Sequence, residues 1–167
     1  MPAFNKDGLK VYFPSDGTQI GNGGEYETDG LFRVIDIEIN LANLTQAETV
    51  QSRVVFPKGK VLGRVEVIAD TAAATGVAID VGLVRQDASE TEIDYNGILA
   101  AFPIANMNVE GETNRLHAGD TYAGALVGTV ASASYPGYIT ASATTSTLFT
   151  AGRIRLRLYW YKKTATT

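Results

Sequence analysis

Apolar side chains recur at every second position in several separate stretches of the sequence, which is the period of a half-buried β-strand. The clearest stretches are residues 31–40, 61–69, 77–83 and 153–163. In the last stretch the two faces differ in kind: Ile154, Leu156, Leu158 and Trp160 alternate with Arg153, Arg155 and Arg157. Each stretch therefore predicts a strand with one buried face.

Weaker patterns bring the number of strands to about eight. They lie at residues 9–13, 53–56, 122–130 and 138–147. Helix signals are sparse, and the one candidate is residues 94–102, where Pro103 would stop one or two helical turns. We predict an all-β fold, an antiparallel, jelly-roll-like β-sandwich of about eight strands with at most one short helix near 95–102. An immunoglobulin-like sandwich is the alternative, although its Cys…Trp…Cys spacing is absent.

The chain of 167 residues has the length of one domain. We divide it into an N-terminal arm with a glycine-rich break at residues 1–30, a sandwich domain at 31–163 and a tail at 164–167. The break is the glycine-rich stretch 21–24. The N-terminus lacks a signal-peptide core, and no apolar run approaches the roughly 18 residues of a membrane span. We therefore expect synthesis in the cytoplasm and no membrane partner.

Composition excludes several kinds of site. The chain has no cysteine, and His117 is its one histidine, so neither a thiolate nor a multi-histidine metal site can form. The 14 basic and 18 acidic residues give a net charge of −4, which argues against a globally basic nucleic-acid binder. A serine–histidine–acid triad would have to use His117, which lies in a loop-like stretch without a nucleophile elbow.

Acidic residues offer the remaining catalytic or metal-binding chemistry. The run Asp87, Glu90, Glu92 and Asp94 has alternate spacing that a calcium ion could use, although a solvated loop is the simpler interpretation. A glycoside hydrolase would need two carboxylates that face each other across a cleft. The candidates are Asp36 with Glu38 and Glu66 with Asp80. We expect no catalytic, cofactor or metal site, and no enzymatic activity.

The final predicted strand carries the sharpest charge pattern. Five of the 14 basic residues lie between Arg153 and Lys163 with no acid among them, and two tyrosines continue the same outer face. This face is either a contact surface for an acidic partner or a solvated face that protects the sheet from unwanted pairing. The candidate contact residues are Arg153, Arg155, Arg157, Tyr159 and Tyr161.

The N-terminal arm supplies a second group of candidate contacts. Apolar and basic groups on a mobile strand can add to the sheet edge of a neighbouring molecule. These candidates are Phe4, Lys6, Lys10, Tyr12 and Phe13.

Small residues dominate the stretch 121–147. Alanine, glycine, serine and threonine cover a sheet thinly and allow close approach of backbones. Packing around a symmetry axis would cover such a sheet, which indicates a cyclic homo-oligomer. The alternative is a flexible loop followed by one thin strand.

Several of these stretches resemble small virion structural proteins of tailed bacteriophages, in particular head decoration or cement proteins. They are residues 56–67, 70–72, 76–83 and 150–158. The resemblance implies a β-sandwich body that binds the major capsid protein on the outside of an assembled capsid, often as a trimer at local threefold sites. It also implies that the protein stabilises the shell against the pressure of the internal DNA.

We therefore expect a structural virion protein on the capsid surface, as a homotrimer, without a cofactor and without direct nucleic-acid contact. The alternative is a tail-fibre or carbohydrate-binding β-sandwich module. Its exposed aromatic rings would stack on sugars, and the candidates are Tyr95, Tyr135 and Tyr138. A hydrolase that uses paired carboxylates is the third hypothesis.

Overall fold

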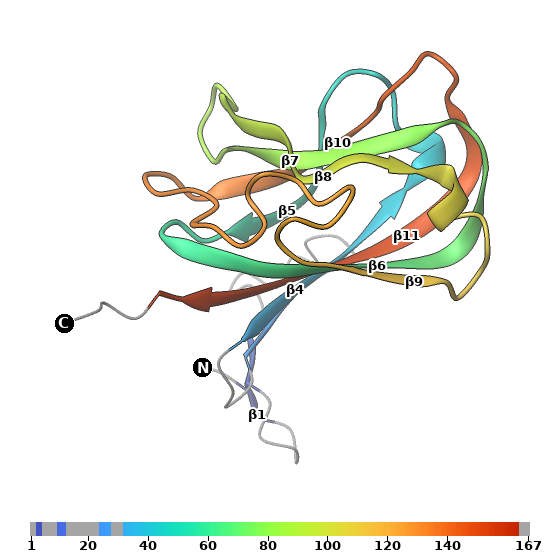
Figure 1. Cartoon of the computed structure of the whole chain (residues 1–167). Helices are drawn as coiled ribbons and strands as arrows, with labels where there is room; N and C mark the ends of the chain where they lie inside the picture. The colour runs from blue at the N-terminus through green and yellow to red at the C-terminus, as the bar shows by residue number, and fades with distance from the viewer. Residues whose placement is uncertain (1–2, 5–9, 13–23, 28–31, 164–167) are drawn as a thin grey trace.

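The computed structural model describes residues 3–4, 10–12, 24–27 and 32–163, and Figure 1 shows them as an all-β body. Within these ranges there are eleven strands, two short 3-10 helices (η1 and η2) and no α-helix. The elements are β1 (Ala3–Phe4), β2 (Lys10–Tyr12), β3 (Gly24–Glu27), β4 (Arg33–Asn40), η1 (Leu41–Asn43), β5 (Thr49–Phe56), β6 (Lys60–Thr75), β7 (Ala78–Arg85), β8 (Glu92–Pro103), η2 (Ile104–Asn106), β9 (Thr113–Leu116), β10 (Gly137–Ala143) and β11 (Phe149–Lys162).

Strands β4 to β11 form a jelly roll of two facing antiparallel sheets, in the orders β4-β11-β6-β9 and β5-β10-β7-β8. The first of these eight strands pairs with the last, the second with the seventh, the third with the sixth and the fourth with the fifth. Such nested pairing arises when one long hairpin folds over into two sheets. The predicted all-β sandwich of about eight strands is confirmed.

The first sheet continues beyond β4 into the N-terminal region. Strands β1, β2 and β3 form a meander whose last member pairs with β4, which gives the seven-stranded order β1-β2-β3-β4-β11-β6-β9. The predicted strand at 9–13 overlaps β2. The division into arm, body and tail stays a prediction, since residues 1–2, 5–9, 13–23, 28–31 and 164–167 lie outside the described part.

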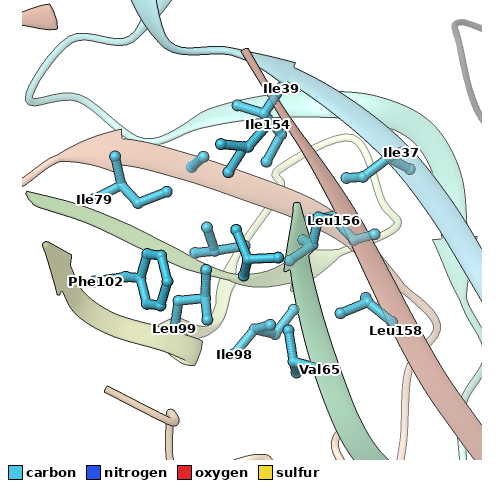
Figure 2. Close-up of a cluster of buried hydrophobic side chains, with 14 of the residues drawn as sticks. Ile37, Ile39, Val65, Ile79, Ile98, Leu99, Phe102, Ile154, Leu156 and Leu158 are labelled. Carbon is cyan, nitrogen blue, oxygen red and sulfur yellow. The ribbon is translucent and has the colours of Figure 1, made fainter. Parts of the chain in front are cut away.

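The core lies between the two sheets and follows from the period of two. Alternate side chains of β4, β11 and β6 point inward from the first sheet, and side chains of β7 and β8 meet them from the second (Figure 2). The residues at its centre are fully buried or within 1% of it: Ile35, Ile37, Ile39, Val65, Val67, Ile79, Val81, Leu83, Ile139, Ile154, Leu156 and Leu158. Each large aliphatic side chain buried in this way contributes about 1.5–3 kcal/mol relative to solvent exposure.

The short helix considered for residues 94–102 does not form, because this segment belongs to β8. Its pairing with β7 is irregular: Val81 and Leu83 lie two positions apart, yet their partners Leu99 and Asp94 lie five apart. Such bulges insert extra residues and break the period of two. The buried positions 98, 99 and 102 therefore have the spacing of a helix face although the backbone is extended.

The strand predicted at 122–130 is also wrong, because these residues form turns within the long connection between β9 and β10. Isolated bridges attach this connection to both sheets: Val61 to Val130 and Leu62 to Val127 on β6, and Leu99 to Ala123 on β8. A Cβ atom on Gly124 would overlap the backbone at Gly97, which explains the small residue there. The connection thus closes one side of the sandwich, so its small residues do not by themselves require an oligomer.

Within the described part of the chain, no helix is long and apolar enough to span a membrane.

A bulge of β8 also crosses the outer face of the second sheet at Gly82. A Cβ atom on Gly82 would overlap the carbonyl of Asp94 and the backbone of Tyr95. We expect Gly82→Ala to lower the free energy of unfolding, measured in urea, by about 3 kcal/mol, because neither backbone segment can move without disrupting strand pairing.

Gly111→Ala is the matched control. Its added Cβ would meet no atom within 4 Å, although its φ of +82° strains any L residue. It should cost about 1–2 kcal/mol. Equal losses for the two variants would contradict the close crossing at Gly82.

Candidate functional site

The five candidate contact residues of the last strand lie on the outer face of β11, as the alternation predicts. The residues that alternate with them point to the other face and are buried in the core: Ile154, Leu156, Leu158 and Trp160. Strand β11 lies between β4 and β6, so each outward side chain on it has a neighbour on both sides.

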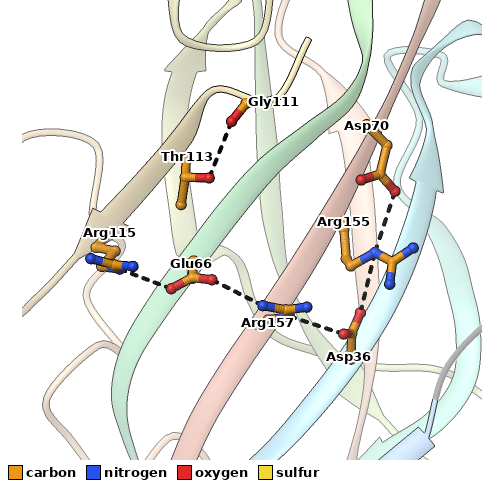
Figure 3. Close-up of polar contacts among 8 residues, drawn as sticks. All are labelled: Asp36, Glu66, Asp70, Gly111, Thr113, Arg115, Arg155 and Arg157. Atoms are coloured by element: carbon orange, nitrogen blue, oxygen red, sulfur yellow. Dashed lines mark hydrogen bonds and ion pairs between the residues drawn. The ribbon is translucent and has the colours of Figure 1, made fainter.

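A row of four alternating charges crosses the first sheet at Arg157. Asp36 on β4 and Glu66 on β6 lie directly opposite Arg157 in register, and Arg115 on β9 lies directly opposite Glu66. The Arg157 Nε donates to Asp36 Oδ2 at 3.0 Å, and its Nη1 donates to Glu66 Oε1 at 3.2 Å. Arg115 Nε donates to Glu66 Oε2 at 3.0 Å, which completes the row in Figure 3.

The other two arginines of β11 are paired in the same way. Arg155 Nε lies 3.3 Å from Asp70 Oδ2 and 3.9 Å from Asp36 Oδ1, and Arg153 Nη1 lies 3.4 Å from Glu38 Oε1. The positive stripe seen in the sequence is therefore compensated by carboxylates of β4 and β6. Asp36, Glu38, Glu66 and Asp70 are the residues that the sequence interpretation of this face left out.

Burial makes the central pairs the strongest part of this face. Glu66 is only 5% exposed, so its charge needs the two guanidinium groups that flank it. Partial burial alone lowers the pKa of Arg157, but the hydrogen bond and charge of Asp36, together with the charges of Tyr159 and Glu66, raise the pKa above its ordinary value. Arg157 thus remains charged and holds the two neighbouring strands in register.

Aromatic rings, in place of ion pairs, cover the end of this face near Tyr159 and Tyr161. The Arg64 guanidinium lies 4.0 Å from the ring centroid of Tyr159, and the rings of Phe32 and Tyr161 meet edge to face at 5.5 Å. Gly63 lies beneath them, because a Cβ there would press against both the Phe32 and Tyr161 rings. We call Phe32, Arg64, Tyr159 and Tyr161 the aromatic patch. Phe32 is 40% exposed, and sequence analysis did not identify it or Arg64.

The candidates on the N-terminal arm fall partly within the described residues. Phe4 of β1 pairs with Lys10 of β2, and Tyr12 of β2 pairs with Glu25 of β3. Lys6 and Phe13 lie outside the described residues. In the sheet order, β3 and β4 separate β2 from β11, so the arm candidates and the β11 candidates share one sheet without being neighbours.

The residues considered for catalysis or metal binding have structural partners. Arg157 bridges Asp36 and Glu66, and Asp80 Oδ1 accepts the backbone N–H of Ala101 at 2.7 Å. The backbone N–H of His117, in an exposed turn, donates to Asp120 Oδ2. No group of three His, Asp or Glu side chains among the described residues is placed to hold a metal ion.

The acidic run at residues 87–94 is distributed between the β7–β8 turn and β8. Asp87 Oδ1 accepts from the backbone N–H and the hydroxyl of Ser89, and Asp94 Oδ1 accepts the backbone N–H of Asn96. Among the tyrosines considered for sugar stacking, Tyr135 is the most exposed. The Arg85 guanidinium lies 4.1 Å from the centroid of its ring.

Glu48 is a titratable group that sequence analysis did not single out. It precedes β5, and its Oε1 accepts a 2.6 Å hydrogen bond from the Ser142 hydroxyl of β10. Burial raises the pKa of this carboxyl above its ordinary value, the hydrogen bond from Ser142 lowers it, and the charges of Asp80 on β7 and Glu92 on β8 raise it further. The net effect is a raised pKa.

Solved structures share the fold of this protein. No protein-family model and no curated protein matches the sequence. A chain of the solved structure "Capsid of Ralstonia phage GP4" has the same fold, with a TM-score of 0.54 and 16% sequence identity over 93% of this chain and 92% of that chain. A chain of the "Cyanophage Pam1 capsid asymmetric unit" aligns with a TM-score of 0.47 and 15% identity over 98% of this chain and 100% of that chain.

Removal of Arg157 should destabilise the sheet. We expect Arg157→Met to lower the free energy of unfolding by about 2 kcal/mol, because Asp36 and the buried Glu66 each lose a charged hydrogen-bond donor. Urea unfolding at low and high salt measures the loss.

Arg153→Met is the matched control on the same strand. Its pair with Glu38 is more exposed, so the loss should stay below about 1 kcal/mol and shrink in salt. If the two variants lost the same free energy, the central row would have no special role.

Glu48→Gln should change the pH dependence of stability. Folding raises the pKa of Glu48, so its contribution is most favourable below the ordinary value and is lost as the pH rises through the folded-state value. We expect the thermal midpoint of Glu48→Gln to exceed that of the wild type at pH 7 and to approach it near pH 4. The exposed Glu90→Gln is the control, and a Glu48→Gln midpoint that does not vary with pH relative to the wild type would refute this prediction.

Proposed function

We propose that this protein is a structural component of a bacteriophage virion that decorates the outside of the capsid as a homotrimer. The observation that carries the proposal is the jelly roll shared with a chain of the Ralstonia phage GP4 capsid over more than nine-tenths of both chains. The sequence resemblance to head decoration proteins supports the same assignment; it lies at residues 56–67, 70–72, 76–83 and 150–158.

The surface chemistry supports action by docking without a catalytic role. Paired carboxylates on the first sheet are occupied by arginine. On the second sheet Asp80 and Asp94 accept backbone N–H groups, and Glu48, just before β5, accepts the Ser142 hydroxyl. Many weak contacts repeated over a lattice give strong overall attachment without a deep binding site. The proposed location is therefore the virion surface, with the major capsid protein as partner.

We place the capsid contact at the aromatic patch of the first sheet. Aromatic residues and arginine are enriched at protein interfaces and supply much of their binding energy. The arginines at 153, 155 and 157 are less suited to this contact, because an acidic partner would have to displace the carboxylates that already hold them.

Co-sedimentation with undecorated capsids of the phage that encodes the chain tests the proposal. The wild-type protein should pellet with the capsids and remain in the supernatant without them. The double variant Phe32→Ala/Tyr161→Ala should bind about tenfold more weakly or worse, because it removes two interface rings.

Tyr135→Ala is the control, since it removes an exposed ring that lies beside Arg85 of the second sheet, outside the aromatic patch. Its binding should equal that of the wild type. Absence of wild-type binding would refute the decoration role, and equal binding of all three proteins would refute the aromatic patch as the contact.

A further inference from the structure

One end of the sandwich is poor in charge: two whole connections, most of a third and the start of a fourth carry none. Residues 39–47, 71–79, 95–109 and 139–152 contain no Asp, Glu, Lys, Arg or His. These ranges hold the β6–β7 and β10–β11 connections, the β4–β5 connection up to Glu48, and η2 at the start of the β8–β9 connection, which goes on to Glu110 and Glu112. We call this surface the uncharged end.

Backbone hydrogen bonds join the four connections into one surface. The N–H of Ala143 donates to Thr45 O at 2.7 Å, that of Thr144 to Ala78 O at 3.0 Å, and that of Ile104 to Val77 O at 2.8 Å. These contacts link β10 to the first connection and to β7, and η2 to the β6–β7 turn. Sequence segments that are far apart therefore form a single continuous face.

The β6–β7 turn is held in a fixed conformation. Thr75 and Gly76 both have positive φ, 58° and 71°, and the Thr75 hydroxyl lies 3.0 Å from that of Thr150. The ring of Phe149 fills the space beside Gly76. A rigid surface loses little entropy when it binds, so this tip is preorganised for contact.

The uncharged end also exposes large apolar groups. Val77, Val109 and Leu148 are 47%, 59% and 39% exposed, and they are three of the six large hydrophobic side chains that are exposed in the described ranges. Small uncharged residues surround them: Ala42, Asn43, Thr45, Gln46, Ala47, Ala74, Thr75, Ala105, Asn108, Ser146, Thr147, Thr150 and Ala151 are also exposed.

The opposite end of the sandwich carries charged residues in its connections. Its connections carry Lys58 between β5 and β6, Asp87 and Glu90 between β7 and β8, and His117 with Asp120 between β9 and β10. The lack of charge at the first end is thus a local property and does not reflect a chain poor in charge.

An uncharged face favours self-association. Around a symmetry axis each residue near the axis meets the same residue of another copy, so any charge there faces a like charge. Identical copies with a net charge of −4 repel elsewhere, and a different partner would gain specificity from charge complementarity that this face cannot offer.

We propose that copies of this chain associate through the uncharged end, with Val77 and Leu148 buried against the neighbouring copies. This inference deepens the proposed homotrimer by naming its contact surface, and it rests on the proposed function only for the number of subunits. Sedimentation equilibrium of the purified full-length chain tests it.

The wild type should form an oligomer, and Val77→Asp and Leu148→Asp should each weaken association about tenfold or more, because each places like charges near the axis. Ser134→Asp adds the same charge at an exposed position of the opposite end and should associate like the wild type. Circular dichroism and thermal unfolding check that each variant is folded, and Ser146→Asp serves as a further variant if one of the others is not.

A wild type that remains monomeric at high concentration would overturn the proposal, as would variants of the uncharged end that associate like the wild type. Failure of the capsid-decoration role gives a different result: the chain would associate through this end yet fail to sediment with capsids.

Discussion

The structure depends on the position of β11 between β4 and β6. Its inward side chains lie at the centre of the hydrophobic core, and its outward side chains face neighbours on both sides. An arginine at the centre of a sheet cannot extend into solvent as freely as one at an edge, so its charge must be compensated locally. Asp36 and Glu66 meet this requirement, and hydrophobic burial on one face is thereby coupled to ion pairing on the other.

The sequence predicted the elements whose structure is determined locally. The strict period of two at 31–40, 77–83 and 153–163 identified β4, β7 and β11 because each has one face against a single core. The period failed at β8, where bulges displace the buried positions, and at 122–130, where alternation occurs in a connection fixed by tertiary contacts. Nothing within either segment's own sequence indicates the bulges of β8 or the turns at 122–130.

The partners of the arginine stripe could not be predicted for a related reason. Arg157 lies 121 positions from Asp36 and 91 from Glu66, so their contact depends on strand order and register across the whole chain. The carboxylates themselves were visible, since Asp36 and Glu38 occupy the polar face of a predicted strand. The sequence of β11 alone therefore predicted a more positive surface than the outer face of the first sheet carries.

The jelly-roll topology explains how two surfaces with different chemistry arise on one small domain. Successive connections alternate between the two ends of the sandwich, so segments that are remote in sequence collect at each end. Charged residues at one end favour contact with water, whereas the scarcity of charge at the other end reduces the repulsion between identical copies. Each end combines several connections, so a single substitution could not have made one end charged or the other uncharged. The difference between the two ends therefore depends on the fold and the sequence together.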